Sequence, residues 1–241
     1  MRIAVISDIH GNLDAFKCVL ADMTPATVDT VYSLGDNVGY GPQPEEVLAL
    51  IRHHGIPSVM GNHELALSDP VILRWFNPTA RTSLERTRDM LSEVSLATIF
   101  DLPTALTAQQ CRFVHGFPPD SPTTYLFQVG DSALEQAFSN ITERLCFVGH
   151  THELLMISFD GKHLRRHDLA QGVITLDPAC RYLINIGSVG QPRDGNNNAK
   201  YVIWDTITDC LDIRFVPYDI ASVVKKIEVA GLPEAHAKRL W

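Results

Sequence analysis

Five short apolar segments of the sequence each lead into a side chain that can bind a metal ion. They span residues 2–7, 30–35, 57–61, 110–114 and 144–149, and each has the pattern of a β-strand. The side chains that follow them are Asp8, Asp36, Asn62, His115 and His150. Because sites in open α/β sheets form at the carboxyl ends of strands, we expect these side chains to meet at one edge of the sheet.

Two further histidines extend this set, since His10 lies two residues after Asp8 and His152 two residues after His150. Residues i and i+2 of an extended chain project to the same side, so each pair should face the same site. A single Asp at a strand end is usually a turn or capping residue, and a single buried His is usually a hydrogen-bonded core residue. Seven such residues in this arrangement indicate a metal centre instead.

The candidate ligands are two carboxylates, one amide oxygen and four imidazoles, with no thiolate among them. Such nitrogen and oxygen donors favour Mn²⁺, Fe²⁺ or Zn²⁺ over Cu⁺ or an iron–sulfur cluster, and the many imidazoles disfavour Mg²⁺ alone. Two divalent ions carry more positive charge than two aspartates can neutralise. The filled site should therefore attract phosphate groups, although the whole chain has a net charge of −8.

The order of the expected elements indicates the fold class. Helical patterns in the first part of the chain lie at residues 13–21, 44–54, 64–101 and 131–139. Later strands are expected at 154–159, 163–169, 173–176, 181–186 and 200–216, followed by helical patterns at 220–230 and 233–240. Asp160-Gly161 predicts a hairpin between the first two of these strands. We expect an α/β protein with two β-sheets packed on each other and flanked by helices, in one domain over residues 1–241.

Composition narrows the function classes. The net charge of −8 argues against a general nucleic-acid binder, so no stable nucleic-acid binding is expected. The five cysteines are widely spaced and form no CxxC motif, which is typical of small buried side chains in a reducing cytoplasm. Asp8 and His10 come too early for a signal peptide, and no apolar run approaches a membrane span. We expect a cytoplasmic protein away from membranes, while its oligomeric state stays open.

Several motifs together resemble a known family. DIHGN at 8–12, GDNVGYG at 35–41, GNHE at 61–64, VHG around His115 and GHTH at 149–152 resemble, in this order, the calcineurin-like metallophosphoesterases. The loop NIGSVGQPRDGN at 185–196 and the later YDI and AGLPE segments resemble the small bacterial and archaeal phosphodiesterase branch, whose members include diadenosine tetraphosphate hydrolases. The resemblance implies a four-layered αββα sandwich of two mixed sheets.

The resemblance also implies a role for each residue of the motifs. Residues for the first metal would be Asp8, His10 and His152. Residues for the second would be Asn62, His115 and His150. Asp36 would bridge both ions, and His63 would act beside them as a general acid rather than as a ligand. Arg193, in the glycine-rich loop, is either a solvated loop residue or a clamp on a substrate phosphate.

These observations predict a phosphoester hydrolase with a dinuclear metal centre. A hydroxide bridging two metal ions would attack a small phosphodiester or nucleotide substrate, with dinucleoside polyphosphates among the candidates. Mn²⁺ is the favoured metal, and Fe²⁺ or Zn²⁺ are the alternatives. One alternative is a serine/threonine protein phosphatase, but Gly39 and Tyr40 stand where those enzymes have Asp and Arg. The other alternative is a non-catalytic scaffold, but such proteins should have lost ligands or His63, and here all of them are present.

Some questions stay open at this stage. The sequence does not name the physiological substrate or the native metal. It does not show what orients His63, since the adjoining Glu64 could point elsewhere. Residues 64–80 either form a lid, whose Trp75 and Phe76 could contact a nucleobase, or are ordinary helical packing. His236 is expected on the surface of the last helix.

Overall fold

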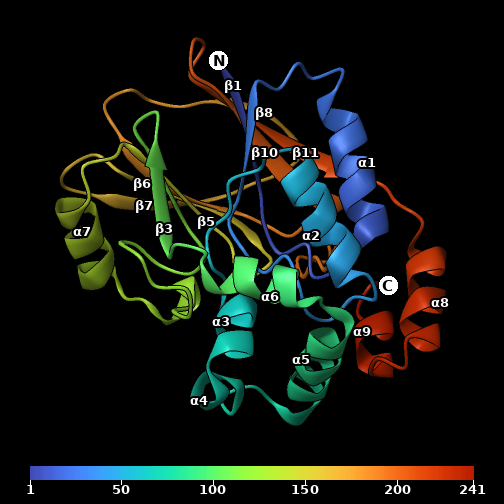
Figure 1. Ribbon diagram of the computed structural model, residues 1–241. Helices are drawn as coiled ribbons and strands as arrows, with labels where there is room; N and C mark the ends of the chain where they lie inside the picture. The colour runs from blue at the N-terminus through green and yellow to red at the C-terminus, as the bar shows by residue number, and fades with distance from the viewer.

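Two mixed β-sheets face each other at the centre of the computed structural model, which describes residues 1–241 (Figure 1). The first sheet has the order β2-β1-β10-β11-β8. Its strands are β1 (Arg2–Ile6), β2 (Thr30–Ser33), β8 (Gly172–Thr175), β10 (Ala199–Asp205) and β11 (Cys210–Val216). The second sheet has the order β3-β4-β5-β9-β6-β7. Its strands are β3 (Ala105–Ala108), β4 (Cys111–Val114), β5 (Leu145–Val148), β6 (Leu154–Phe159), β7 (Leu164–Asp168) and β9 (Arg181–Ile186).

Helices flank the two sheets and complete the four layers of the expected αββα sandwich, so the predicted fold class is confirmed. Two helices lie on the outer face of the first sheet, α1 (Leu13–Met23) and α2 (Pro44–His53), and one covers the second sheet, α7 (Asp131–Asn140). A further group extends below the sheets in Figure 1, comprising α3 (Asn62–Ser68), α4 (Pro70–Leu73), α5 (Pro78–Met90) and α6 (Glu93–Phe100). The remaining helices are the short 3₁₀ helix η1 (Leu126–Gln128), α8 (Ile220–Val229) and α9 (Glu234–Lys238).

Strand β1 shows why the sequence builds four layers rather than two. Its side chains alternate between the two faces of the sheet, as in any strand, yet every residue from Ile3 to Ile6 is fully buried. Ala4 and Ile6 pack with the α1 and α2 side chains, whereas Ile3 and Val5 pack in the core between the two sheets. A strand that is apolar on both faces needs a cover on each side, and the helices and the second sheet provide it.

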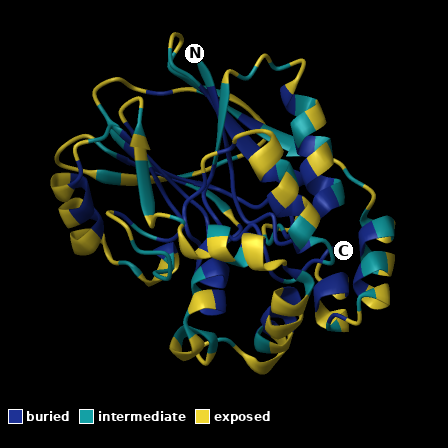
Figure 2. Ribbon diagram, viewed as in Figure 1, coloured by how far each residue is buried: buried dark blue, intermediate teal, exposed yellow.

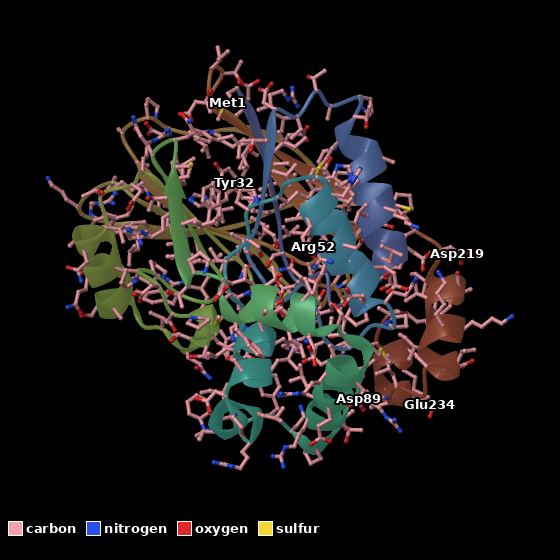
Figure 3. All side chains as sticks on the ribbon, viewed as in Figure 1. Met1, Tyr32, Arg52, Asp89, Asp219 and Glu234 are labelled. Carbon is pink, nitrogen blue, oxygen red and sulfur yellow. The ribbon has the colours of Figure 1, made fainter.

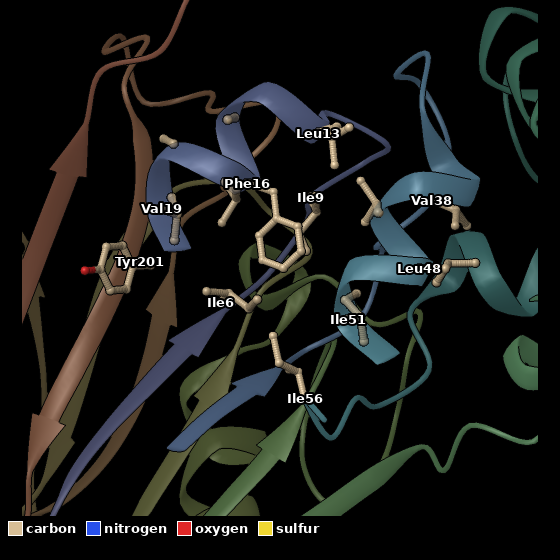
Figure 4. Packing of buried hydrophobic residues seen from close by; sticks show 14 of the residues in the cluster. Ile6, Ile9, Leu13, Phe16, Val19, Val38, Leu48, Ile51, Ile56 and Tyr201 are labelled. Atoms are coloured by element: carbon tan, nitrogen blue, oxygen red, sulfur yellow. The ribbon is translucent and has the colours of Figure 1, made fainter. Parts of the chain in front are cut away.

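The outer core joins α1 and α2 to the first sheet. Phe16 of α1 points from the helix toward Ile6 and Ile9 in the close-up of Figure 4, with Ile51 of α2 on the other side of the ring. Figure 2 shows the same pattern for the whole molecule, because the central strands are dark blue and the outer faces of the helices are yellow. This packing fixes the start of α1, and with it the loop that contains Asp8 and the residues after it.

Three details of the sequence prediction are wrong. Residues 57–61 form no strand, and only Ser58 makes an isolated bridge to Ser33, because the chain turns into α3 at Gly61. The segment 200–216 is two antiparallel strands, β10 and β11, with a turn between Asp205 and Cys210. Strand β3 was not expected at all, since it is a short edge strand with partly exposed residues.

The predicted hairpin is confirmed. The hairpin around Asp160-Gly161 is formed by β6 and β7. Leu155 lies opposite Asp168 at one end of the paired region, and Phe159 lies opposite Leu164 at the other. All five cysteines are free thiols, but only Cys111 and Cys146 are buried, so the prediction of buried cysteines is wrong for the other three. None of the helices has the length and apolar character needed to cross a bilayer.

The last two helices pack against each other at the right of the molecule, where Asp219 and Glu234 mark their beginnings in Figure 3. Their contact is a small separate core of Val223, Ile227, Leu232, Ala237 and Leu240. This pair lies beside the loops that follow β1 and β2, because His10, Tyr40, Val223 and His236 border a common small cavity. The chain's final segment therefore closes one side of the region to which the sequence motifs point.

Candidate metal centre

Loops at the carboxyl ends of strands from both sheets bring the candidate ligands together. Asp8 and Asp36 follow β1 and β2 of the first sheet, and His115 and His150 follow β4 and β5 of the second. The expectation of one edge of one sheet is therefore wrong, because the site lies where the edges of two sheets meet. All seven predicted ligands and His63 are at least 92% buried in this place; they are Asp8, His10, Asp36, Asn62, His63, His115, His150 and His152.

The first group of side chains consists of Asp8, His10 and His152. The Nε2 atoms of His10 and His152 are 3.1 Å apart, and His152 Nε2 is 3.2 Å from Asp8 Oδ1. Asp8 Oδ1 is buried and accepts no hydrogen bond, while Oδ2 accepts from the Ser7 hydroxyl and from the backbone N–H of His150. One oxygen of this carboxylate is thus held by the protein, and the other is left facing two imidazole nitrogens.

The second group consists of Asn62, His115 and His150. His115 Nε2 lies 3.0 Å from Asn62 Oδ1 and 3.1 Å from His150 Nδ1. Asp36 lies between the two groups, with its Oδ2 atom 3.2 Å from His115 Nε2 and 3.8 Å from His10 Nε2. A single carboxylate is therefore within reach of both groups.

Backbone carbonyls hold the outer nitrogen of each of the four imidazoles. His10 Nδ1 is 3.1 Å from Val38 O, and His115 Nδ1 is 2.9 Å from Leu34 O. The remaining two contacts are His152 Nδ1 to Gln191 O at 2.6 Å and His150 Nε2 to Thr123 O at 3.2 Å. A carbonyl only accepts, so the outer nitrogen carries the hydrogen and, in a neutral ring, the inner nitrogen offers a lone pair.

These donors suit divalent cations. Several lone pairs and the orphaned Asp8 Oδ1 converge in one buried volume, an arrangement that is unfavourable without a positive partner. Imidazole nitrogens, carboxylate oxygens and one amide oxygen are also the ligands that Mn²⁺, Fe²⁺ and Zn²⁺ accept. The residues present therefore fit a pair of such ions.

Burial and mutual repulsion shape the protonation of the site. Burial, with the neighbouring His63 and His152, lowers the pKa of His10 well below its usual value, and burial with His115 lowers that of His150 to about 3. Burial also lowers the pKa of His115, but the Asp36 carboxylate outweighs it and raises the value to about 9. The raised pKa favours a protonated His115 beside the charged Asp36 carboxylate, and an incoming cation would displace that proton.

The backbone of the site differs from the expected extended form. Five candidate ligands have φ between 50° and 68°, in the left-handed region: Asp8, His10, Asp36, His150 and His152. Asp and His enter this region more easily than most residues, yet each such residue stores about 1–3 kcal/mol of strain. The i, i+2 pairs face the same site because the chain curls at both positions and not because it is extended.

Glu64 fastens two of the site's loops to each other. Its Oε2 atom accepts from the backbone N–H groups of Asp36 and Gly61 at 2.8 and 3.0 Å, and Oε1 accepts from Asn37 N at 2.7 Å. Burial raises the pKa of Glu64 to about 7, and the Asp36 charge adds to this effect. Glu64 thus points away from His63, although the two residues are neighbours in the sequence.

Aromatic packing orients His63 instead. Its ring lies 4.4 Å from that of Tyr40 and 5.1 Å from that of Phe76, both edge-on, and 4.6 Å from His10. A Cβ atom at Gly39 would be 2.1 Å from His63 Nδ1, so the ring fills the space that a side chain at position 39 would need. His63 Nε2 lies 3.9 Å from Asp36 Oδ2.

Asn62 and His63 belong to the first turn of α3, so their side chains diverge by helical rather than extended geometry.

Arg193 lies half-buried next to the first group. Its backbone N–H donates to His152 O, its Nη2 donates to Gln191 Oε1 at 3.2 Å, and its Nε is buried without a partner. Burial raises the pKa of Tyr40 to about 12, and the positive charge of Arg193 beside it opposes this rise. Arg193 is therefore partly buried against the site, and its Nε atom has no acceptor within the protein.

His236 is a residue of this region that the sequence prediction placed wrongly. It is 3% exposed rather than on the surface, and its ring lies 4.5 Å from that of Tyr40. Neither ring nitrogen has a hydrogen-bond partner, and burial together with Arg239 lowers its pKa to about 4. Helix α9 has only five residues, too few for a periodic pattern that would have marked its buried side.

The contacts of Glu64 generate a prediction about stability. In Glu64→Gln, an amide NH₂ replaces one oxygen that now accepts from backbone N–H groups, so a donor would face a donor. We expect a loss of about 1–3 kcal/mol in the free energy of unfolding, measured by urea denaturation at about pH 8, where the carboxylate is charged.

The exposed Glu93 at the start of α6 provides the matched control. Glu93→Gln should change stability by less than about 0.5 kcal/mol. Equal losses in the two variants would show that the contacts of Glu64 do not stabilise the loops.

Comparison with known proteins finds similar sequences and structures over most or all of the chain. The model of the calcineurin-like phosphoesterase superfamily domain matches residues 1–209. An uncharacterized protein of Methanocaldococcus jannaschii is 36% identical over 244 residues, which covers 99% of this chain and 97% of that protein. The crystal structure of a metallophosphoesterase from Sphaerobacter thermophilus is 38% identical, has a TM-score of 0.87 and covers 100% of this chain and 98% of its own.

A shorter match involves an enzyme with a named substrate. The symmetrical bis(5'-nucleosyl)-tetraphosphatase of Baumannia cicadellinicola is 40% identical over 65 residues, which is 26% of this chain and 23% of that protein. This similarity covers only a part of the chain and is much less extensive than the two described before it.

Proposed function

Because this chain belongs to the calcineurin-like phosphoesterase superfamily, we propose that it hydrolyses small phosphodiester or nucleotide substrates with two divalent cations. The observation that carries this proposal is the geometry around Asp36. Two groups of buried donors lie on either side of one carboxylate, and every imidazole among the proposed ligands is oriented by a backbone carbonyl. A non-catalytic scaffold would not need to maintain this strained and crowded arrangement.

The proposal assigns the side chains as follows. One ion would be held by Asp8, His10 and His152, the other by Asn62, His115 and His150, and Asp36 would be shared. When bound, the ions would supply Lewis-acid stabilisation of the phosphoryl charge and an activated water as nucleophile. Mn²⁺ is the favoured metal, with Fe²⁺ or Zn²⁺ as alternatives, because imidazoles make up more than half of the donor set.

Two further side chains would act on the substrate directly. His63 would donate a proton from Nε2 to the departing oxygen. Burial lowers the pKa of His63 to about 4, so the ring needs the negative charge of a bound phosphate to be protonated near neutral pH. Arg193 would bind a phosphate oxygen through its Nη1 group, which donates no hydrogen bond within the protein, while Nη2 stays on Gln191.

Small substrates are favoured over phosphoproteins for two reasons. Gly39 and Tyr40 leave no arginine in the second motif, and the α8–α9 pair with His236 covers one side of the site. The partial match to a bis(5'-nucleosyl)-tetraphosphatase keeps dinucleoside polyphosphates among the candidates. Free cysteines are typical of proteins in a reducing compartment, so the cytoplasm is the proposed location.

The proposed function predicts a specific metal dependence. After metal stripping, the protein should hydrolyse no member of a panel of phosphomonoesters, phosphodiesters and dinucleoside polyphosphates. Mn²⁺ should restore turnover more than Mg²⁺, since Mg²⁺ prefers oxygen ligands. Full turnover in excess chelator, with no metal detected in the protein, would refute the proposal.

The proposed role of His63 predicts a dependence on the leaving group. His63→Ala should keep both ions but lose about 10²–10⁴ in kcat on alkyl phosphodiesters, where the leaving oxygen needs a proton. The loss on p-nitrophenyl esters should be small, because nitrophenolate leaves unprotonated.

His53→Ala serves as the control, since His53 is an exposed histidine in the last turn of α2. It should leave kcat unchanged on both substrates. Equal losses of His63→Ala on both substrates would exclude proton donation. A loss of bound metal would instead make His63 a ligand, which its approach to His10 and Asp36 allows geometrically.

The role proposed for Arg193 predicts a change in KM. Arg193→Ala should raise KM about 10- to 100-fold, because hydrogen bonds between charged groups contribute about 1.5–3 kcal/mol. The effect should be largest for substrates with several phosphates. Arg193→Lys should rescue it only in part, and the exposed Arg165→Ala should have no effect. A KM that stays constant across the panel would contradict the role.

A further inference from the structure

A cavity of about 200 Å³ opens beside the second group of candidate ligands. Asn62 and His150 of that group border it, so a molecule in this cavity would be adjacent to a phosphate at the metal centre. Most of the remaining lining comes from the turn between α4 and α5 and from the segment before η1. None of the ten lining residues is Asp, Glu, Lys or Arg.

Aromatic side chains dominate this lining. The Tyr125 ring stacks on the His150 ring with centroids 3.7 Å apart and an interplanar angle of 21°, and Phe127 stacks on Tyr125 at 4.9 Å. Trp75 borders the cavity and is 68% exposed. Tryptophan is usually well buried, and an exposed aromatic side chain at the rim of a cavity is typical of a ligand surface.

The cavity is formed by a fixed turn rather than by a loose segment. The Arg81 guanidinium donates through Nη2 to the carbonyl oxygens of Arg74 and Phe76, at 2.9 and 3.3 Å. Asn77 caps α5 by accepting from Ala80 N at 3.0 Å, and the Phe76 ring packs against the core and against His63. These contacts hold the turn in position before any ligand arrives.

We propose that this cavity binds the nucleobase of a nucleotide substrate whose phosphate lies at the metal centre. This inference rests on the proposed function and narrows its substrate class. A planar uncharged ring can stack on the exposed Trp75, with Tyr125 bordering the same cavity, and stacking of a base on an aromatic side chain contributes about 1–3 kcal/mol. A second phosphate has no cationic partner among the lining residues, so the cavity suits the base rather than the polyphosphate.

One polar residue of the cavity offers a hydrogen bond to the edge of the base. Asn77 uses its Oδ1 atom for the helix cap, so the Nδ2 group remains as a donor and forms no hydrogen bond within the protein. Base edges carry ring nitrogens and carbonyl oxygens that accept such a bond.

Calorimetric titration of the Mn²⁺-loaded protein tests the inference without requiring turnover. Adenosine 5'-monophosphate should bind more tightly than ribose 5-phosphate, which carries the same phosphate but no base. Trp75→Ala should raise the Kd of adenosine 5'-monophosphate about 5- to 100-fold and that of ribose 5-phosphate less than about twofold. Trp75→Phe, which retains an aromatic face, should recover most of the affinity.

Trp241 offers a matched control, since it is 67% exposed and does not line the cavity. Trp241→Ala should leave both Kd values unchanged. Equal Kd values of the two probes for the wild-type protein, or an equal effect of Trp75→Ala on both, would overturn the nucleobase site. If the base-selective effect appears but no ester is hydrolysed, the cavity assignment stands and the proposed hydrolase function fails.

Discussion

The main constraint on this structure is the convergence of acceptor atoms in one buried volume. The ligand atoms of the aspartates and histidines fall into overlapping groups of three within 4.8 Å, the Asn62 amide oxygen lies 3.0 Å from His115 Nε2, and Asp8 Oδ1 has no hydrogen-bond donor. Such a cluster is unfavourable for a protein on its own, because each buried acceptor requires a donor or a cation. The rest of the fold must hold these groups together against their mutual repulsion.

Several features of the structure meet this demand. Two sheets present the carboxyl ends of their strands at a common junction, and the covering helices fix the loops that follow. Glu64 joins the Asp36 loop to α3, and backbone carbonyls orient the histidine rings. Left-handed backbone at Asp8 and Asp36 stores strain that only a well-packed surrounding can maintain. The buried apolar faces of β1 provide that surrounding on both sides.

The sequence carried much of this information in local form. The strands that lead into Asp8, Asp36, His115 and His150 could be predicted directly, and the ordered motifs pointed to the family and to the αββα layers. The pairing of β1 with β10 could not be predicted, since it joins residues about two hundred positions apart. The sequence therefore did not show that β1 and β4 belong to different sheets. The contacts of Glu64, the burial of His236 and the left-handed conformations were equally hidden, because they depend on tertiary packing rather than on periodicity.

The central claim is that the two donor groups hold one ion each, on either side of Asp36. Anomalous scattering from crystals equilibrated with Mn²⁺ tests it most directly. A dinuclear centre should give two peaks per chain about 3.5–4 Å apart, one at Asp8, His10 and His152 and the other at Asn62, His115 and His150. No peak, or a single peak at saturating Mn²⁺, would contradict a dinuclear centre.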